Sequence, residues 1–269
     1  MGSNLALGIV LSVAMGVGGY YKRALSKSGL VGAMVVGTTI FGLGGWRWGA
    51  LLITFFVSSS LLSAFKKGQK AAVAEKFDKG SRRDLGQTLA NGGLGAALAV
   101  LSALWPHPLW WFAFLGALGT VNADTWATEL GVLSKQQPRL ITTGRPVPPG
   151  TSGGLTLNGT LASLAGGALI GAVAWALSGG TQPAGLILIA GLGGLTGALV
   201  DSLLGATLQA LYRCDRCGEE TEKKICCAQP TQPSRGLPWL NNDWVNFISS
   251  GAGALVALGL GLASIQLIS

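Results

Sequence analysis

The sequence predicts an all-α integral membrane protein, a polytopic helix bundle in which residues 1–269 form a single membrane domain. Three observations support this fold class. Charged residues make up only 11% of the chain, whereas about 25% is typical of soluble domains. The chain contains 43 glycines, which let transmembrane helices approach closely. Apolar runs of about 20 residues, the length that crosses a bilayer, recur throughout. About eight transmembrane helices are expected, with seven or nine as alternatives.

The apolar runs define the helices in order along the chain. They cover residues 4–21, 29–46, 47–65, 86–105, 108–131, 157–178, 184–211 and 243–267. Short connections at 45–47 and 105–108 predict two hairpins, because neighbouring helices joined by a few residues lie antiparallel. The first run lacks a basic segment before it and a cleavage site after it, so we interpret it as a retained helix rather than a signal peptide.

Basic residues predict the orientation of the chain. Eighteen of the 19 lysines and arginines fall in the connections after the first, third, fifth and seventh helices, and only Arg47 falls on the other side. Because cytoplasmic loops collect basic residues, both termini are expected to be extracytoplasmic. The net charge of +8 then reflects topology and contact with anionic membrane lipids rather than nucleic-acid binding. The expected location is a bacterial plasma membrane or a thylakoid membrane.

Asp124 and Glu129 end the apolar run at 108–131. A carboxylate within hydrocarbon costs about 2.5–3.5 kcal/mol and persists mainly where a function requires it. Helical spacing places Asp124 and Thr128 on one face, with Glu129 about 100° around the helix. Both acids can border one polar cavity that faces the cytosol. The alternative is that one of them pairs with a loop arginine.

The loop from Arg145 to Gly154 resembles a phosphate-binding turn. Arg145 supplies charge, Gly150, Gly153 and Gly154 expose backbone N–H groups, and Thr151 and Ser152 add hydroxyls before a helix that carries Asn158. Such a turn at a helix N-terminus suits an anion, here the phosphates of a nucleotide. It is not a Walker A sequence. A plain turn that caps the following helix is the alternative.

Further polar residues interrupt apolar segments on the same side. Asp201 and Gln209 lie near the cytoplasmic end of the seventh run, and Asn242, Asp243 and Asn246 open the eighth, where at least one residue is expected to cap the helix. Arg83, Gln87 and Asn91 share one helix face at i, i+4 and i+8, while Arg23 and Lys27 form a basic turn. These residues are candidate substrate contacts, with snorkelling and interhelical hydrogen bonds as the alternative.

Four cysteines, Cys214, Cys217, Cys226 and Cys227, lie in a charged loop at 212–242 that is expected to be cytosolic. A reducing compartment disfavours a structural disulfide. A small zinc knuckle is one interpretation, and free thiols or an oxidised pair are the others, since adjacent cysteines are awkward ligands for one tetrahedral ion. The one histidine, His107, lies in the outer hairpin, which leaves no histidine for general-base catalysis at the cytosolic face.

The ordered motifs resemble the transmembrane protein 19 family, which includes plant and cyanobacterial phytyl-phosphate kinases of tocopherol and phylloquinone synthesis. The similar segments are Arg-Asp-x-Gly-Gln-x-x-Ala-Asn-Gly at 83–92, Ala-Asp-Thr-Trp-Ala-Thr-Glu-x-Gly at 123–131, the loop at 145–154, Asp-Ser-x-x-Gly-Ala at 201–206 with Gln209, the Cys-x-x-Cys pair and Asn-Asp-x-Val-Asn at 242–246. The resemblance covers nearly the whole chain.

This resemblance implies transfer of the terminal phosphate of a nucleoside triphosphate, CTP, to an isoprenoid monophosphate such as phytyl phosphate. Phosphoryl transfer needs a divalent metal and cations more than a strong base. Asp124, Asp201 and Asp243, with Glu129 as a further candidate, are expected to bind Mg²⁺. Arg145 and Gly150 to Gly154 would hold the nucleotide, and Arg83 or Arg23 the lipid phosphate. The alternatives are a CTP-dependent cytidylyltransferase and a transporter or flippase of anionic lipid. The oligomeric state stays open.

Overall fold

The computed structural model describes residues 2–74, 82–181 and 184–266 and confirms the predicted class, a helical integral membrane bundle. Each predicted helix is present. The helices in these residues are α1 (Gly2–Tyr21), α2 (Lys27–Thr39), α3 (Trp46–Ala64), α4 (Lys67–Ala74), α5 (Leu85–Leu104), α6 (Leu109–Gly131), α7 (Leu157–Leu177), α8 (Gly185–Thr207) and α9 (Asn242–Gln266).

Several elements differ from the sequence-based expectation. Helix α2 continues as a π-helix, η1 (Ile40–Gly44), which ends where Gly45 adopts a φ of 89°. Helix α4 was not expected, and α8 ends at Thr207 instead of at residue 211. Strands β1 (Arg139–Leu140) and β2 (Gly154–Leu155) pair at the base of the loop before α7.

The segment expected to be a loop at 212–242 is largely a small β structure, residues 211–235, which we call the strand module. Strands β3 (Leu211–Arg213), β4 (Glu220–Thr221) and β7 (Gln232–Arg235) form an antiparallel sheet in the order β4-β3-β7. Strands β5 (Ile225–Cys226) and β6 (Gln229–Pro230) form a separate hairpin.

Six helices among the described residues are long and apolar enough to cross a membrane. They are Lys27–Gly44, Trp46–Ala64, Leu85–Leu104, Leu157–Leu177, Gly185–Thr207 and Asn242–Gln266. The apolar part of α1, Leu5–Tyr21, is shorter. Helix α6 is not among the six, and polar residues such as Asn122, Asp124 and Glu129 interrupt its second half. Eight membrane crossings therefore stay a prediction.

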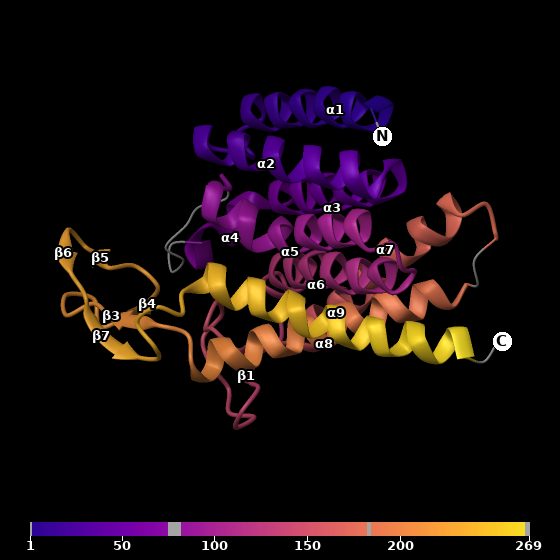
Figure 1. Cartoon of the computed structure of the whole chain (residues 1–269). Coiled ribbons are helices and arrows are strands. Elements are labelled where there is room, and N and C mark those ends of the chain that lie inside the picture. Colours follow the sequence, from indigo (N-terminus) through magenta and orange to yellow (C-terminus); the bar gives the residue numbers. More distant parts are fainter. Residues whose placement is uncertain (1, 75–81, 182–183, 267–269) are drawn as a thin grey trace.

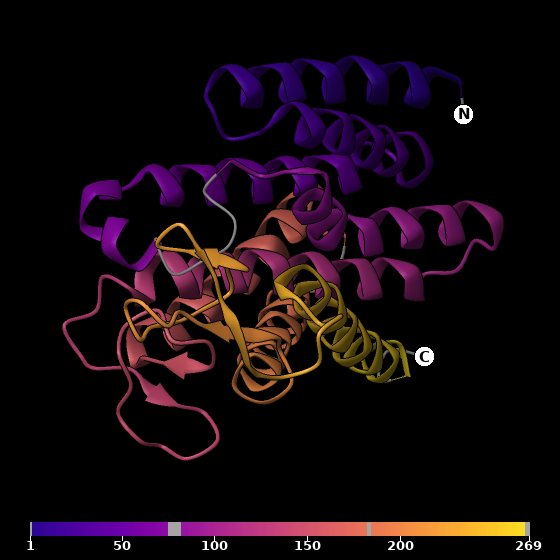
Figure 2. The same cartoon turned by 90° about the vertical axis from the view of Figure 1, so that its left-hand side faces the viewer.

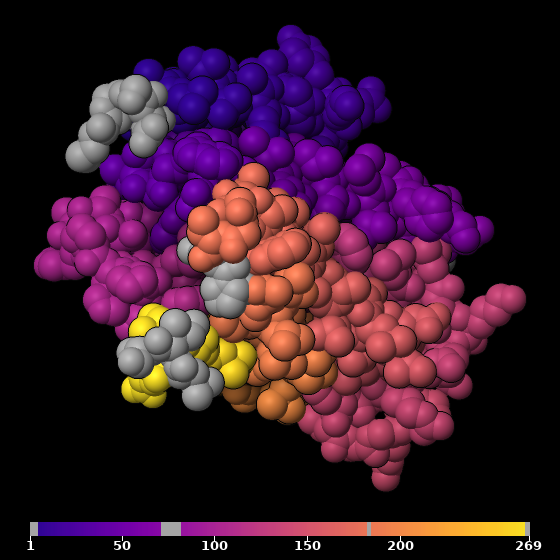
Figure 3. Space-filling model, turned by 90° about the vertical axis from the view of Figure 1, so that its right-hand side faces the viewer, coloured from indigo at the N-terminus to yellow at the C-terminus, as the bar shows by residue number. Residues whose placement is uncertain are grey.

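The helices run side by side, and the strands and α4 gather at one end of the bundle (Figure 1). The start of α1 and the end of α9 lie at the opposite end. Figure 3 looks at that opposite end, where the end of α7 and the start of α8 lie near the middle of the face. The start of α1 and the end of α9 thus lie at the same end of the bundle, and the extracytoplasmic location of the termini stays a prediction. Which side faces the cytosol is still a prediction.

Helix α6 is the centre of the bundle. Every residue from Ala113 to Ala123 is buried, and α6 packs against α7, α8 and α9 as well as α3 and α5. A helix that is apolar around its whole circumference must be enclosed by protein or lipid, and this one is enclosed by protein. Its polar C-terminal turns therefore emerge inside the ring of neighbouring helices, at the end of the bundle that carries the strands.

Glycines allow this close packing. A Cβ added to Gly116 would lie 2.2 Å from the carbonyl oxygen of Gly253, and one added to Gly253 would lie 1.9 Å from Thr120 Oγ1. Gly194 meets the backbone of Gly119 at 2.8 Å in the same way. Lipid tails are as apolar as leucine, so transmembrane helices associate through such close van der Waals contact rather than through the hydrophobic effect.

We expect Gly253→Ala to destabilise the protein by about 1–3 kcal/mol, because the new methyl group overpacks the contact between α6 and α9. The matched control is Gly259→Ala on the same helix, where a Cβ meets no atom within 4 Å. Thermal denaturation in detergent, followed by size-exclusion chromatography, measures the difference. Equal melting temperatures for the two variants would contradict the packing argument.

Candidate active site

A cavity of about 650 Å³ lies among the residues at the end of the bundle that carries the strands. Figure 2 looks at this end, where the strand module and the loop before α7 lie over the helix ends. The cavity brings together most of the predicted site residues. These are Arg83, Gln87, Asn91, Asp124, Thr128, Glu129, Gly150, Thr151, Ser152, Gly153, Gly154, Asp201, Gln209, Asn242, Asp243 and Asn246.

Asp124 of α6 and Asp201 of α8 are two acids of the helix bundle that come together at the cavity. Both line the cavity, and their carboxylates interact electrostatically. Ser249 of α9 donates a hydrogen bond to Asp201 Oδ2 at 3.3 Å. Two like charges at one site repel each other, so a cation placed between them would stabilise both.

The predicted magnesium site fits two carboxylates better than three or four. In residues 2–74, 82–181 and 184–266, the four cysteines are the one group of three or more metal-binding side chains with closely spaced ligand atoms. Asp243 lines the cavity in the first turn of α9 but is not part of such a group. Mg²⁺ typically takes one or two protein carboxylates together with substrate phosphates and water, so Asp124 and Asp201 suffice.

Glu129 forms an ion pair, as the alternative reading of the acids anticipated, although its partner is a lysine. Lys70 Nζ contacts Glu129 Oε2, and its side chain is only 9% exposed. Lys70 also donates to the carbonyl oxygen of Leu62 at 2.7 Å, and Ser63 Oγ donates to Glu129 Oε1. The carboxylate is therefore already engaged by α3 and α4. The role of Glu129 as a metal ligand stays a prediction, with its carboxylate oxygens bonded here to Lys70 and Ser63.

Arg83 brings a fixed positive charge into the cavity. Its backbone is held by the turn between α1 and α2, because its N–H donates to the oxygen of Ala24 at 2.9 Å and its carbonyl accepts from Ser26 at 3.0 Å. The guanidinium lies 5.7 Å from the ring centroid of Phe55 and donates to Ser60 Oγ at 3.3 Å. Burial lowers the pKa of Arg83, while the carboxylate of Glu129 opposes that shift. Arginine nevertheless keeps its charge.

The glycine loop packs closely on α8. Gly150 and Gly153 adopt φ values of 80° and 81°, and a Cβ at Gly153 would lie 2.4 Å from that of Ala206. The loop leads into α7, where Thr156 caps the helix by accepting from the N–H of Gly159 at 3.0 Å. Residues at the N-termini of α5, α7 and α9 all line the cavity. Three helix N-termini at one cavity favour a negatively charged ligand.

Four of the residues predicted to bind the nucleotide or the lipid phosphate do not line the cavity: Arg23, Lys27, Arg145 and Asn158. All four are exposed. Arg145 lies outside the cavity because Gly144, with a φ of 67°, reverses the chain direction. The carbonyl of Arg145 then accepts from the N–H of Leu140 at 2.9 Å. The side chain of Asn158 is directed to Ser134 Oγ, at 3.5 Å, on the outside of α7.

Two predicted contacts have a different setting from the one expected. Gln87 completes a capping box, since its Oε1 accepts from the N–H of Asp84 at 3.1 Å. Gln209 lies beyond the end of α8 rather than within the helix, and its Nε2 donates to Glu222 Oε1 at 2.8 Å. The start of α9 is capped by the preceding residue, Asn241, whose Oδ1 accepts from the N–H of Trp244 at 3.1 Å. Asn242 and Asn246 line the cavity and remain candidates for contacts with a substrate.

Several cavity residues are not apparent from the sequence. Lys70 forms the ion pair with Glu129, Ser63 donates to the same carboxylate, and Tyr212, Glu222 and Lys224 come from the strand module. Lys70 and Lys224 were counted only as basic residues that determine topology. A signal that could have singled out Lys70 is the need of Glu129, near the end of an apolar helix, for a cationic partner.

A second, almost entirely apolar pocket adjoins the cavity between α1, α2, α3 and α5. Arg83 and Asn91 line both spaces, so the polar cavity and the apolar pocket meet at these two residues. The other residues of the apolar pocket are Ser12, Met15, Gly16, Leu25, Ala33, Val36, Gly37, Phe41, Leu52, Ile53, Phe55, Phe56, Thr88 and Gly92.

The fold and the cavity define an integral membrane protein that can hold an anionic group at the end of its helix bundle and an apolar group beside it. The chain belongs to the family described as integral membrane protein DUF92, whose model matches residues 10–254. This membership confirms the family resemblance that the sequence motifs predict.

Three relatives show how widely the family is distributed. Protein PGR of Arabidopsis thaliana is 33% identical over 91% of this chain and 92% of its own length. The uncharacterized membrane protein sll0875 of Synechocystis is 32% identical over 89% of this chain and 83% of its own. Protein VTE6, chloroplastic, of Arabidopsis thaliana is 28% identical over 87% and 64%. No solved structure matches the chain.

Lys70→Met should destabilise the protein by roughly 3–5 kcal/mol, because it leaves the carboxylate of Glu129 buried without its cation. Glu129→Gln should cost less, and the double variant should recover part of the loss. Thermal unfolding of the three variants in detergent completes a double-mutant cycle. Additive effects of the two single changes would show that the pair does not interact.

Proposed function

We propose that this protein transfers the terminal phosphoryl group of a nucleoside triphosphate, CTP, to an isoprenoid monophosphate of the phytyl phosphate type at the cytosolic edge of the membrane. One observation carries the proposal: a polar cavity lined by Asp124, Asp201 and the glycine loop shares Arg83 and Asn91 with an apolar pocket. The resemblance to phytyl-phosphate kinases supports this reaction class.

The reaction needs no strong base from the protein. An oxygen of the prenyl monophosphate attacks the γ-phosphorus, a new P–O bond forms, and the bond between that phosphorus and the β–γ bridging oxygen breaks. The products are a prenyl diphosphate and CDP. A phosphate monoester is largely deprotonated near neutral pH, since its second pKa is about 6. The one histidine, His107, lines a pocket with residues of the opposite end of the bundle.

The nucleotide binds on the side of the cavity formed by α7, α8 and the glycine loop. The N–H groups of Gly150, Ser152 and Gly153 and the N-terminus of α7 would donate hydrogen bonds to the phosphate oxygens, whereas the N–H groups of Thr151 and Gly154 already donate to the carbonyl oxygens of Pro148 and Thr151. Asp124 and Asp201 would hold Mg²⁺. The bound ion would neutralise part of the negative charge of the phosphates. Among the described residues, Lys224 is one of three cationic side chains that line the cavity, together with Lys70 and Arg83. Arg145, which is exposed, is not assigned to this step.

The lipid phosphate binds at Arg83, with the amide of Asn91 beside it. The guanidinium can form charge-assisted hydrogen bonds with phosphate oxygens, and its packing against Phe55 and Phe56 limits its movement. The first part of the isoprenoid chain then enters the apolar pocket between α1, α2, α3 and α5, whose volume of about 70 Å³ is too small for the whole chain, and the remainder would extend into the bilayer. A transporter would place its site near the bilayer midplane, whereas the charged residues here gather at one end of the bundle.

Purified protein in detergent, with Mg²⁺, phytyl phosphate and CTP labelled at the γ-phosphate, should produce a labelled lipid diphosphate and unlabelled CDP. A second reaction with CTP labelled at the α-phosphate tests the cytidylyltransferase alternative, in which the lipid carries the α label and the γ label leaves in pyrophosphate. Failure of phytyl and geranylgeranyl phosphate to gain either label would refute the proposal.

Asp124→Asn should lower kcat at least about 100-fold, the scale of the several kcal/mol that a bound cation contributes. Its thermal stability should be retained, because the amide has the same shape and removes charge repulsion with Asp201. Initial rates over a range of Mg²⁺ concentrations measure the effect. Full activity in a folded Asp124→Asn protein would remove this residue from the metal site.

Arg83→Gln should lower kcat/KM for the lipid phosphate by about 10–100-fold, which corresponds to the 1.5–3 kcal/mol of hydrogen bonds to a charged group. Arg145→Gln is the matched control and should leave kcat/KM unchanged, because that side chain is outside the cavity. Rates at varied lipid phosphate and saturating CTP separate the two. A larger loss of kcat/KM in Arg145→Gln than in Arg83→Gln would show that Arg83 does not bind the lipid phosphate.

A further inference from the structure

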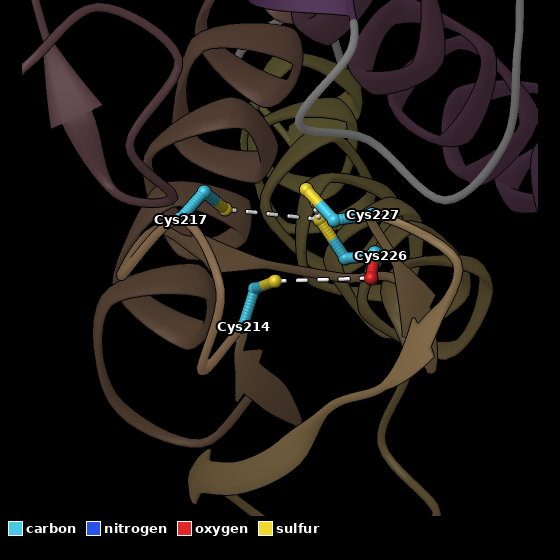
Figure 4. Close-up of side chains that lie close together, drawn as sticks. All are labelled: Cys214, Cys217, Cys226 and Cys227. Carbon is cyan, nitrogen blue, oxygen red and sulfur yellow. Dashed lines mark hydrogen bonds between the residues drawn. The ribbon is translucent and has the colours of Figure 1, made fainter.

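The four cysteines of the chain come together in the strand module (Figure 4). Cys214 and Cys217 flank the turn between β3 and β4, while Cys226 and Cys227 lie at the turn between β5 and β6. All four are free thiols, and their sulfur atoms lie within 4.8 Å of one another. The sulfur of Cys226 is 3.9 Å from that of Cys217 and 3.8 Å from that of Cys227.

These spacings match a tetrahedral thiolate site. With Zn–S bonds of about 2.3 Å, the sulfur atoms of a regular tetrahedron are about 3.8 Å apart. A disulfide would need about 2.05 Å. The cluster is thus too open for disulfides and has the size of a metal site.

The backbone of the first turn favours this use of Cys214. The N–H of Gly218, whose φ is 72°, donates to the carbonyl of Cys214 at 2.8 Å and closes the turn. Backbone N–H groups of Cys217 and Arg216 point to the sulfur of Cys214. Hydrogen bonds to a sulfur atom stabilise the negative charge that a thiolate carries as a metal ligand.

The second turn removes the difficulty of adjacent cysteine ligands. Cys226 pairs with Gln229, and the two residues between them, Cys227 and Ala228, have φ values of 51° and 62°. Such a two-residue hairpin usually contains Asn-Gly, because side chains other than those of glycine, asparagine and aspartate rarely adopt positive φ. This backbone brings the two neighbouring sulfur atoms onto one ligand cluster. A bound metal would offset the cost of about 1–2 kcal/mol for each strained residue.

We propose that Cys214, Cys217, Cys226 and Cys227 bind one structural Zn²⁺ ion. Four thiolates complete a tetrahedral shell and leave no open position for substrate, which distinguishes a structural zinc site from a catalytic one. The ion would join the two hairpins of the strand module, whose strands are only two to four residues long.

This zinc site would also support the cavity, a point that rests on the proposed function. The segment between Cys217 and Cys226 carries Glu222 and Lys224, which line the cavity. The module is joined to α8 by the bond from Gln209 to Glu222 and by Arg235 Nη1, which donates to the carbonyl of Gly205 at 3.0 Å. Loss of zinc is expected to displace Lys224 and to weaken nucleotide binding while leaving the helices assembled.

Zinc content of the full-length protein tests the site directly. Protein with a tag free of histidine, purified in detergent under reducing conditions, should contain about one zinc per chain by mass spectrometry. The variant with all four cysteines changed to serine should contain almost none. Substitution by Co²⁺ should give the intense absorption of tetrahedral cobalt thiolate. The single change His107→Ala is the control and should retain the metal.

Two outcomes would overturn the proposal. One is wild-type protein without zinc whose four thiols all react with a thiol reagent before any chelator is added. The other is an unchanged zinc content in the serine variant. If that variant fails to fold, removal of zinc from the wild type by a chelator, with release of four thiols, gives the same decision. None of these measurements depends on kinase activity, so failure of the proposed function would leave the zinc result intact.

Discussion

The structure depends on the close enclosure of α6 by its neighbours. Eleven consecutive buried residues, Ala113 to Ala123, occupy the axis of the bundle, and Gly116 and Gly119 bring the backbones of α8 and α9 into contact with them. Because α6 is shielded from lipid on all sides, its last turns can carry Asn122, Asp124 and Glu129 without exposing them to hydrocarbon. The close packing of the apolar half of α6 therefore allows its C-terminal turns to carry polar residues.

The same enclosure explains why the polar residues form a network rather than scattered sites. Asn122 is fully buried, donates to the carbonyl of Gly166 at 2.7 Å and accepts from Ser58 at 2.9 Å. It joins α3, α6 and α7 directly beneath the cavity. Buried polar groups that are all satisfied fix the relative positions of helices. The carboxylates of Asp124 and Glu129, which follow Asn122 on α6, are therefore held in fixed positions. Fixed positions suit a reaction that depends on the placement of charged groups.

The sequence predicts the helices well, because a bilayer requires runs of about 20 apolar residues and such runs are visible without homologues. Asp124 and Asp201 are equally visible, since a charge inside such a run stands out. Lys70 and Lys224 cannot be recognised in the same way. They lie among many other basic residues, and the neighbouring sequence does not indicate which of these side chains reach the cavity. Arg145 and Gln209 were misplaced for a related reason: a turn at Gly144 and an early end of α8 redirect them, and both depend on tertiary contacts.

Under the proposed function, the junction at Arg83 has a consequence for how two very different substrates would reach one site. A nucleotide can arrive only from water, whereas a prenyl chain partitions into the bilayer and diffuses in two dimensions. The polar cavity lies at the end of the bundle and the apolar pocket lies between α1, α2, α3 and α5, so the two substrates would approach the site from different sides. Binding order is then not imposed by access. The lipid product also keeps its tail in the apolar phase throughout, ready for the next membrane enzyme without crossing water.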